Sequence, residues 1–407
     1  MSIWVFLGLL VTVTLAVRLL PVIPVRYRIV AAVLVALVFF LMAPWLLDGY
    51  RLFQLSRVAI WVIVAMGLNI LTGHNGQISL GHGAFVLLGA YTSAILMDGH
   101  EQVGFVDASP WPFWTTIIAG GIVAGAAGFL LGFPALRLTG PYLAIATLAL
   151  VISLPSIIRK YDGLTGGSQG LFVSQPAPPP GLESIIDRDE WLYLLTLLVA
   201  TVMLVIAWSV LRGPLGRAFV AVRESEVAAA AMGINVARTK VAAFTISAFY
   251  AGVAGALLTI LLGVMTPESV DIVTSINFLT AIVIGGLASI LGAVIGGLVL
   301  VLLPSDGPGI VANLPLVSED VVSKAPGAIQ GLLVIFVVLA LPYGAAGAYH
   351  RLMALGPAGV WANMRGLPQQ TRSRIHGMWE NMVWSWQEAP WNRERTPTAR
   401  PKEGDSS

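Results

Sequence analysis

Two histidines, His74 and His82, lie in a stretch that carries no charged residue, LNILTGHNGQISLGHGAFVLLGAY at residues 68–91. Imidazole nitrogens relay protons and bind metal ions, and both kinds of chemistry usually recruit a carboxylate partner. This stretch contains no carboxylate. We therefore interpret the histidines as polar partners for backbone that leaves the helical conformation at the neighbouring glycines. A proton relay or a metal site is the alternative.

The rest of the chain lacks the common energy-converting and zinc-hydrolase motifs. A phosphate-binding loop needs a lysine that directly follows a glycine. None of the four lysines does so: Lys160, Lys240, Lys324 and Lys402. The chain has no cysteine, no HExxH zinc motif and no acid pair within an apolar stretch. We expect a protein that is not an enzyme and binds no cofactor or metal, and that either takes energy from a partner or conducts passively.

Long apolar stretches must position these residues. Of the 407 residues, 57% are hydrophobic and 11% are charged, whereas soluble domains carry about a quarter charged residues. The net charge of +2 excludes a nucleic-acid-binding protein held by positive charge. Apolar stretches of about 20 residues cross a bilayer as helices, so we predict an all-α polytopic membrane bundle of about ten segments, some broken or re-entrant. The uncharged stretches are 1–17, 29–47, 58–97, 112–136, 138–158, 191–211, 241–263, 272–303 and 328–349.

The signs of the connecting segments predict the orientation. Segments rich in Lys and Arg favour the cytoplasm, which places 18–28, Arg137, 212–240 and the C-terminus inside and the amino terminus outside. The stretch 272–303 breaks this alternation because both of its flanks are acidic. We predict that the Gly285–Gly286 pair bends it into a hairpin with an entering and a returning half. One long tilted helix is the alternative.

A segment of mixed charge, RGPLGRAFVAVRESEVAAAAMGINVARTK at residues 212–240, is typical of a docking element. Pro214 and Gly216 are expected to end the preceding span. Residues 217–232 are rich in helix formers, and Gly233 is placed to end that helix at its C′ position. We interpret the helix as the contact with a partner protein. An interfacial helix lying on lipid headgroups is the alternative.

Five motifs, in one order, carry a resemblance to a known family. They are GLNILTGHNGQISLGHGAFVLLGAY, GFPALRLTGPYLAIATLAL, LTGGSQGL, GRAFVAVRESEVAAAAMGINVARTKVAAFTISAFYAGVAGAL and GGLASILGAVIGGLVL. Residues 58–342 are similar to the membrane permease subunits of branched-chain amino acid ABC importers, specifically the M-type of the two paired permeases. Permeases for urea and related amides share much of the pattern, so such a substrate is the alternative. A passive small-solute channel is a second alternative.

The resemblance implies a heteromeric importer in a bacterial or archaeal inner membrane. Two different permeases form the path for leucine, isoleucine or valine. Two cytoplasmic ATP-binding cassette ATPase subunits drive it, and an extracytoplasmic substrate-binding protein delivers the substrate. The partners are therefore these proteins and the membrane lipid, with no nucleic acid, and the separate ATPases explain the missing phosphate-binding loop.

The motifs also carry over functional residues. The segment that couples to the ATPases maps to Gly216, Arg217, Arg223, Glu224, Ala228, Ala229, Met232, Gly233 and Ile234. The translocation path maps to Asn69, Thr72, Gly73, Gln77, Ser79, Gly81 and Gly83, to which we add Gly285 and Gly286 from the second interrupted stretch. The outer loop, where the binding protein is expected to dock, contributes Thr165, Gly166, Gly167 and Gly170.

We expect three regions along the chain. Residues 1–50 hold two N-terminal spans, the first of which we interpret as a membrane anchor and not a cleaved signal peptide, because Arg18 follows the apolar run. Residues 51–345 form the permease core. Residues 346–407 form a cytoplasmic tail that is basic, rich in tryptophan and partly disordered.

Overall fold

The structure is a computed structural model that describes residues 3–19, 34–98, 111–138, 140–312, 331 and 344–347. All of these belong to one unit, residues 1–347, and the second unit, residues 348–407, lies outside the described residues. Several sequence-based predictions therefore concern residues that the structure does not describe. They are the C-terminal tail, most of the basic segment 18–28 and most of the apolar stretch 328–349.

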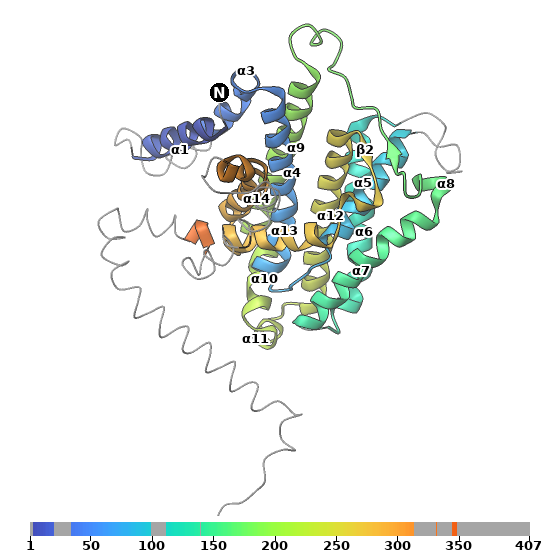
Figure 1. The fold of residues 1–407 in the computed structure, drawn as a ribbon. Coiled ribbons are helices and arrows are strands. Elements are labelled where there is room, and N and C mark those ends of the chain that lie inside the picture. Colours follow the sequence, from blue (N-terminus) through green and yellow to red (C-terminus); the bar gives the residue numbers. More distant parts are fainter. Residues whose placement is uncertain are drawn as a thin grey trace, which may run out of the picture. The chain divides into compact units, whose positions relative to one another are not determined.

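Helices make up nearly all of the described structure (Figure 1). Six helical stretches are long and apolar enough to cross a membrane, and three shorter apolar helices accompany them. The prediction of an all-α helical bundle is confirmed, whereas the count of about ten segments is not. Residues 34–41 are also helical. The labelled helices are α1 (Ile3–Leu19), α3 (Ala43–Leu46), α4 (Gly49–Leu68), α5 (His82–Asp98), α6 (Phe113–Ala135), α7 (Pro141–Lys160), α8 (Asp162–Thr165), α9 (Arg188–Arg212), α10 (Pro214–Glu224), α11 (Glu226–Ala231), α12 (Val236–Leu262), α13 (Ile272–Gly285) and α14 (Ile290–Ala312).

The core of the bundle lies around α12, which packs against α4 on one side and against α5 and α6 on the other (Figure 1). Three glycines meet where α5, α6 and α12 cross. A methyl group on Gly252 of α12 would overlap the carbonyl oxygen of Gly120 in α6, and one on Gly89 of α5 would overlap the backbone of Gly252. Small residues drive helix association in lipid because they let backbones approach closely.

One face of α6 consists of small residues that allow the close packing against α12. Its buried residues recur every four positions, at Gly120, Ala124, Gly128 and Gly132, and this spacing places them on one side of a helix. Large apolar residues cover the opposite side, where Ile118 is 53% exposed. The small face therefore packs against α12, and the large face is suited to lipid.

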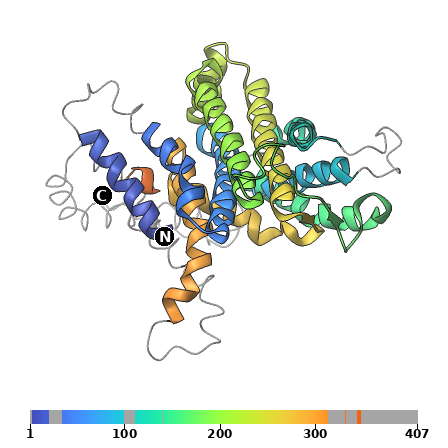
Figure 2. The same cartoon turned by 90° about the horizontal axis from the view of Figure 1, so that it is seen from above.

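The N-terminal residues pack against a second core cluster on the same side of the bundle as α14 (Figure 2). Ile3 and Phe6 of α1 are fully buried there, together with Leu52 of α4. The hydroxyl of Tyr193 in α9 donates to the Phe40 carbonyl at 2.9 Å. The residues that precede α4 therefore brace α4 and α9.

Two short strands lie at the C-terminal end of α12. β1 (Leu171–Phe172) pairs antiparallel with β2 (Val264–Met265), and Leu171 lies opposite Met265. A 3₁₀ turn, η2 (Pro267–Ser269), follows β2 and leads into α13. The pairing ties the loop after α7 to the segment that enters the hairpin.

Two helices extend beyond the uncharged stretches of the sequence. α4 begins at Gly49 and contains Arg51 and Arg57. α14 continues past residue 303 to Ala312. A helix need not stop where a charge-free run stops, because long charged side chains near a helix end can extend toward water or lipid headgroups.

Candidate translocation and coupling site

The polar stretch that follows α4 interrupts the helix, as predicted. Residues Asn69–His74 (η1) widen into a π-helical turn, and the chain is then non-helical until α5 begins at His82. The Thr72 hydroxyl donates to the Gln77 carbonyl at 2.9 Å, and the Gln77 N–H donates to the Leu71 carbonyl at 3.1 Å. Groups freed by the break thus satisfy one another, as non-helical backbone at membrane depth requires.

The second interruption has the predicted hairpin form. α13 ends at Gly285, Gly286 has a φ of 115° and Ala288 a φ of 59°, and α14 begins at Ile290. The two limbs pack closely, because a methyl group on Gly285 would overlap the carbonyl oxygen of Gly292. The alternative of one long tilted helix is wrong, since Gly286 and Ala288 adopt positive φ angles that an α-helix does not contain.

Asn69 joins the two interruptions. Its side chain is buried, Nδ2 donates to the Ser289 carbonyl at 2.7 Å, and Oδ1 accepts from the Ala288 N–H at 2.8 Å. Gly73 is required at the same junction, because a methyl group there would lie 2.5 Å from the Ala288 nitrogen. The two sets of predicted path residues therefore meet at this point.

His82 holds the start of α5 against α12. It is 1% exposed, its Nε2 lies 2.6 Å from the Ser247 Oγ, and its Nδ1 lies 3.2 Å from the Ser79 Oγ. The Ser247 hydroxyl donates its proton to the Gly67 carbonyl at 2.6 Å, so His82 must donate through Nε2. Both ring nitrogens therefore contact serine hydroxyls and not backbone groups, which were the partners expected from the sequence.

The other two predicted glycines of this stretch allow α7 and α13 to approach. Gly81 packs against Thr147 of α7, whose hydroxyl accepts from the Leu80 N–H at 3.0 Å. The Gly83 N–H donates to the Ser275 Oγ of α13 at 2.9 Å. Each substitution by alanine would place a methyl group against these partners. The start of α5 is thus fixed by three neighbouring helices.

Exposure alternates along the non-helical residues between η1 and α5. Asn75, Gln77 and Ser79 are buried, whereas Gly76 and Ile78 are exposed. The burial of Gln77 and Ser79 places them on the inner side of this segment, and the exposed residues Gly76 and Ile78 lie at its surface.

The docking segment folds as two helices, and the predicted single helix over 217–232 is wrong. α10 ends at Glu224, and Ser225, with φ −162° and ψ 115°, separates it from α11. The Ser225 side chain accepts from the Ala228 N–H at 3.2 Å. Serine is a strong N-cap, and its capping of α11 outweighs the helix propensity of the residues on either side.

Gly233 ends α11 at the predicted position. It has a φ of 83°, and the Ile234 N–H donates back to the Ala229 carbonyl at 3.0 Å, which is a Schellman closure. The short helix leaves Val227 82% exposed and Met232 81% exposed, while Ala229 is buried. Val227 was not among the predicted residues, although a branched apolar residue beside an alanine run was a usable signal.

Arg223 connects the docking segment to the first interruption. Its Nη1 donates to the Gly73 carbonyl at 2.6 Å, and its stem covers Gly76, where a methyl group would lie 3.0 Å from the Arg223 Cγ. An ion pair of 2.6 Å between Lys240 and Glu226 holds α11 to α12. Arg223 therefore joins α10 to the carbonyl of Gly73 in η1.

The remaining predicted docking residues have local contacts or lie at the surface. Gly216 is buried where a methyl group would overlap the Leu211 carbonyl. Arg217 is exposed, and its Nη1 lies 3.4 Å from the Arg212 carbonyl oxygen. Glu224 lies 3.6 Å from Arg223. Exposed pairs of this kind contribute little to stability, so Arg217 and Glu224 chiefly present charge at the surface.

The predicted binding-protein residues form a tight turn after α8. Gly166, Gly167 and Gly170 have φ angles of 69°, 56° and 75°, and the Thr165 hydroxyl donates to the Ile158 carbonyl at 2.7 Å. Thr165, Gly167 and Gly170 are buried, whereas the intervening tip is exposed. Docking through this turn stays a prediction.

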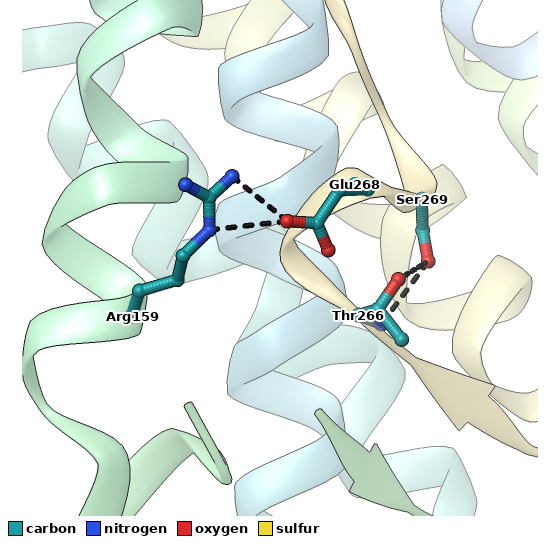
Figure 3. Close-up of polar contacts among 4 residues, drawn as sticks. All are labelled: Arg159, Thr266, Glu268 and Ser269. Atoms are coloured by element: carbon teal, nitrogen blue, oxygen red, sulfur yellow. Dashed lines mark hydrogen bonds and ion pairs between the residues drawn. The ribbon is translucent and has the colours of Figure 1, made fainter. Parts of the chain in front are cut away.

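An ion pair lies beside this turn (Figure 3). Arg159, at the end of α7, donates from Nε to the Glu268 Oε1 at 3.0 Å, and its Nη2 lies 2.8 Å from the same oxygen. Glu268 belongs to η2, where the hydroxyls of Thr266 and Ser269 lie 3.0 Å apart. The pair links α7 to the segment that leads into α13.

The residues that the structure describes do not form a metal centre or a serine-hydrolase site. In the described ranges, no three His, Cys, Asp or Glu side chains come together to hold a metal ion. The Nδ1 of His74 lies 3.2 Å from the Asn69 carbonyl, so His74 and His82 have separate partners. Residues Gly166–Gly170 match the GxSxG pattern of serine hydrolases, but that motif requires a strand-to-helix turn. Here a short helix precedes the turn and a strand follows it.

Comparison with known proteins decides the family. Residues 50–340 match the family described as branched-chain amino acid transport system / permease component. This chain belongs to that family. Together with the six helices that are long and apolar enough to span a bilayer, membership makes the chain a multi-pass membrane permease.

Curated relatives from this permease family specify the type. The high-affinity branched-chain amino acid transport system permease protein LivM of Salmonella typhimurium strain LT2 is 37% identical over 257 residues, 58% of this chain and 58% of that protein. LivM of Escherichia coli K12 is 38% identical over 251 residues, 56% of this chain and 57% of that protein. LivH of the same Salmonella strain is 29% identical over 298 residues, 70% of this chain and 91% of LivH.

The higher identity to LivM than to LivH confirms the predicted M-type resemblance. The chain spans about 58% of the length of the LivM relatives that it matches. None of the solved structures matches the chain.

Proposed function

We propose that this chain is the transmembrane permease subunit of an ATP-driven importer of branched-chain amino acids. The family match over residues 50–340 supports a transport role, and the printed names of the LivM relatives support the substrate class. The observation that carries the mechanism is the hydrogen bond from Arg223 to the Gly73 carbonyl, at 2.6 Å. It joins an exposed docking element to the interrupted helix.

The proposed assembly lies in a bacterial or archaeal inner membrane, with the C-terminus in the cytoplasm. A second permease of the LivH type completes the translocation path. Two ATP-binding cassette ATPase subunits bind from the cytoplasm, and an extracytoplasmic substrate-binding protein docks over the turn at Gly166–Gly170. This chain itself is not an enzyme, because ATP hydrolysis belongs to the ATPase subunits.

Docking on the ATPases uses the exposed end of α11. Val227 and Met232 are each more than 80% exposed, and exposed apolar side chains on a small element are typical anchors for a partner groove. The exposed charges of Arg217 and Glu224 form the polar rim. Lys240 and Glu226 keep α11 attached to α12, so a force on α11 also reaches the bundle.

The conformational switch runs through the two interruptions. When the ATPases close on ATP, α10 moves and Arg223 pulls on the Gly73 carbonyl. Because Gly73 packs against Ala288 and Asn69 bonds to both breaks, the first interruption and the hairpin shift together. Packed elements of this kind have discrete arrangements, which suits alternating access.

The proposed path runs along the surface formed by Gly76 and Ile78, between this chain and the second permease. No charged residue occurs between residues 58 and 97, so the segment itself carries no formal charge, and the charge beside it is that of Arg223, whose stem packs over Gly76. The buried residues Gln77 and Ser79 lie on the inner side of this segment.

Uptake in cells tests the proposal. Labelled leucine, isoleucine, valine and urea are supplied to cells with and without this chain, with ATP depletion and omission of each partner as controls. We expect loss of ATP-dependent leucine, isoleucine or valine uptake when the chain or a partner is missing. Loss of urea uptake alone would replace the substrate class by amides. Flux that survives ATP depletion and needs no partner would overturn the proposal in favour of a channel.

A further inference from the structure

Two neighbouring buried amide side chains at the first interruption have polar atoms without hydrogen bonds. Asn75 is 3% exposed and Gln77 is 7% exposed. Within the described part of the chain, Asn75 Oδ1 and Nδ2 and Gln77 Oε1 have no hydrogen-bond partner. Buried amides are nearly always bonded in folded proteins, and each unbonded atom costs stability. Their persistence here therefore indicates a role other than stabilising the fold.

The unbonded atoms make a specific set. Two are oxygens that accept hydrogen bonds, and one is a nitrogen that donates. Arg223 adds a positive charge nearby, since its stem covers Gly76, which lies between the two amides. A ligand that suits this set carries a cluster of donors next to an acceptor, preferably an anionic one.

We propose that Asn75 and Gln77 bind the head group of a zwitterionic amino acid during its passage. The α-ammonium donates to the Asn75 and Gln77 oxygens, and the α-carboxylate accepts from the Asn75 nitrogen on the side nearest Arg223. The inference rests on the proposed function, because it assumes that an amino acid crosses this segment. It adds Asn75, which the motifs did not single out, and it moves Gln77 from the lining of a path to a binding site.

The position of the pair explains how access to it is controlled. Both amides point into the subunit while Gly76 and Ile78 cover the outer side. The same segment is attached to α10 through Arg223 and the Gly73 carbonyl. A movement of α10 therefore turns the covering residues aside and brings the amides to the path. In the arrangement described here, Asn75 Oδ1, Asn75 Nδ2 and Gln77 Oε1 are buried without hydrogen-bond partners.

Isosteric variants test the site. Asn75→Leu and Gln77→Met keep side-chain volume and remove the polar atoms. Gln54→Met is the matched control, because Gln54 is a buried amide of α4 (2% exposed) whose Nε2 also lacks a partner. Two quantities are measured on the purified complex of both permeases and ATPases without binding protein: equilibrium dialysis of tritiated leucine, and the thermal midpoint without substrate.

We expect Asn75→Leu to weaken leucine binding by about tenfold, as the loss of hydrogen bonds to one side chain does. Its thermal midpoint should stay equal to wild type or rise, and Gln54→Met should bind leucine as wild type does. Isoamylamine and 4-methylpentanoate, which each lack one charged group of leucine, should compete more weakly than leucine.

Unchanged leucine binding in both isosteric variants would overturn the site, and so would a lowered thermal midpoint of Asn75→Leu, which would mean a structural role. Absence of leucine binding to the wild-type complex would overturn it as well. Uptake assays distinguish failure of this binding site from failure of the proposed importer function. If wild-type cells show ATP-dependent leucine uptake that Asn75→Leu leaves intact, the site fails and the importer stands. If wild-type uptake is absent, the importer itself fails.

Discussion

Replacing Arg223 with methionine should uncouple ATP hydrolysis from transport without unfolding the permease. The Arg223 guanidinium donates to the Gly73 carbonyl at 2.6 Å, and its aliphatic stem packs over Gly76. Methionine keeps an unbranched apolar stem over Gly76 but has no donor for the carbonyl. The variant therefore removes the hydrogen bond that transmits movement and preserves the packing around it.

The size of the effect follows from the exposure of the side chain. A hydrogen bond to a charged group contributes about 1.5–3 kcal/mol. The Arg223 side chain is 40% exposed, so water competes for the guanidinium and the lower value, about 1.5 kcal/mol, applies. If that free energy is the link between α10 and the interrupted helix, its loss lowers leucine transported per ATP hydrolysed by about tenfold.

The assay is reconstitution of the importer in liposomes, with leucine uptake and phosphate release measured in the same sample. Arg223→Lys keeps the positive charge but replaces the guanidinium by an ammonium group. It should give a ratio of leucine uptake to ATP hydrolysis between those of wild type and Arg223→Met. Arg238→Met is the matched control, because Arg238 is exposed in the first turn of α12 and its removal changes the net charge equally. A ratio of uptake to hydrolysis in Arg223→Met equal to that of wild type would refute the reasoning.

Three further substitutions test the parts that hold the interruptions. Gly285→Ala should abolish uptake and lower the thermal midpoint, because the added methyl group overlaps the facing limb of the hairpin. The control is Gly8→Ala, where nothing lies within 4 Å of the added methyl group, and it should change neither quantity. His82→Ala should lower the free energy of unfolding by about 3 kcal/mol, since it removes buried hydrogen bonds and leaves a cavity; denaturation in detergent measures this, and a change below about 1 kcal/mol would contradict it. Arg159→Glu should impair uptake that depends on the binding protein while costing under about 1 kcal/mol of stability, as exposed pairs do, and the added exchange Glu268→Arg should restore it. Failure of the double exchange to restore uptake would show that the ion pair is not what matters.

The local breaks in the bundle were predictable because the residues that cause them act locally. Gly76 and Gly286 adopt positive φ angles that only glycine reaches readily, and polar residues of the first interruption, such as Asn69 and Thr72, offer replacement hydrogen bonds. The pairing of the breaks was not predictable. Asn69 reaches the Ser289 carbonyl across 220 residues of sequence, and no local pattern states which distant carbonyl an asparagine meets.

Errors at the docking segment have a different cause. The residues around Ser225 favour a helix, and the prediction weighed their summed propensity above one capping residue. In the structure the Ser225 side chain bonds to the Ala228 N–H, and the extended backbone at this position separates α10 from α11. The sequence pattern also did not predict which residues of the first interruption are buried. Gln77 is buried beside Asn75 in the structure, which the sequence pattern did not indicate, and its place in a path stays a prediction.

The central claim is that this chain imports branched-chain amino acids only as part of an ATP-driven assembly. It is tested most directly in liposomes that contain this chain, a LivH-type permease and the ATPases, with ATP on the ATPase side and labelled leucine with binding protein on the other. The account predicts leucine accumulation against its gradient, lost when this chain, ATP or the binding protein is omitted. Accumulation that persists without this chain, or leucine flux through this chain alone without ATP, would contradict it.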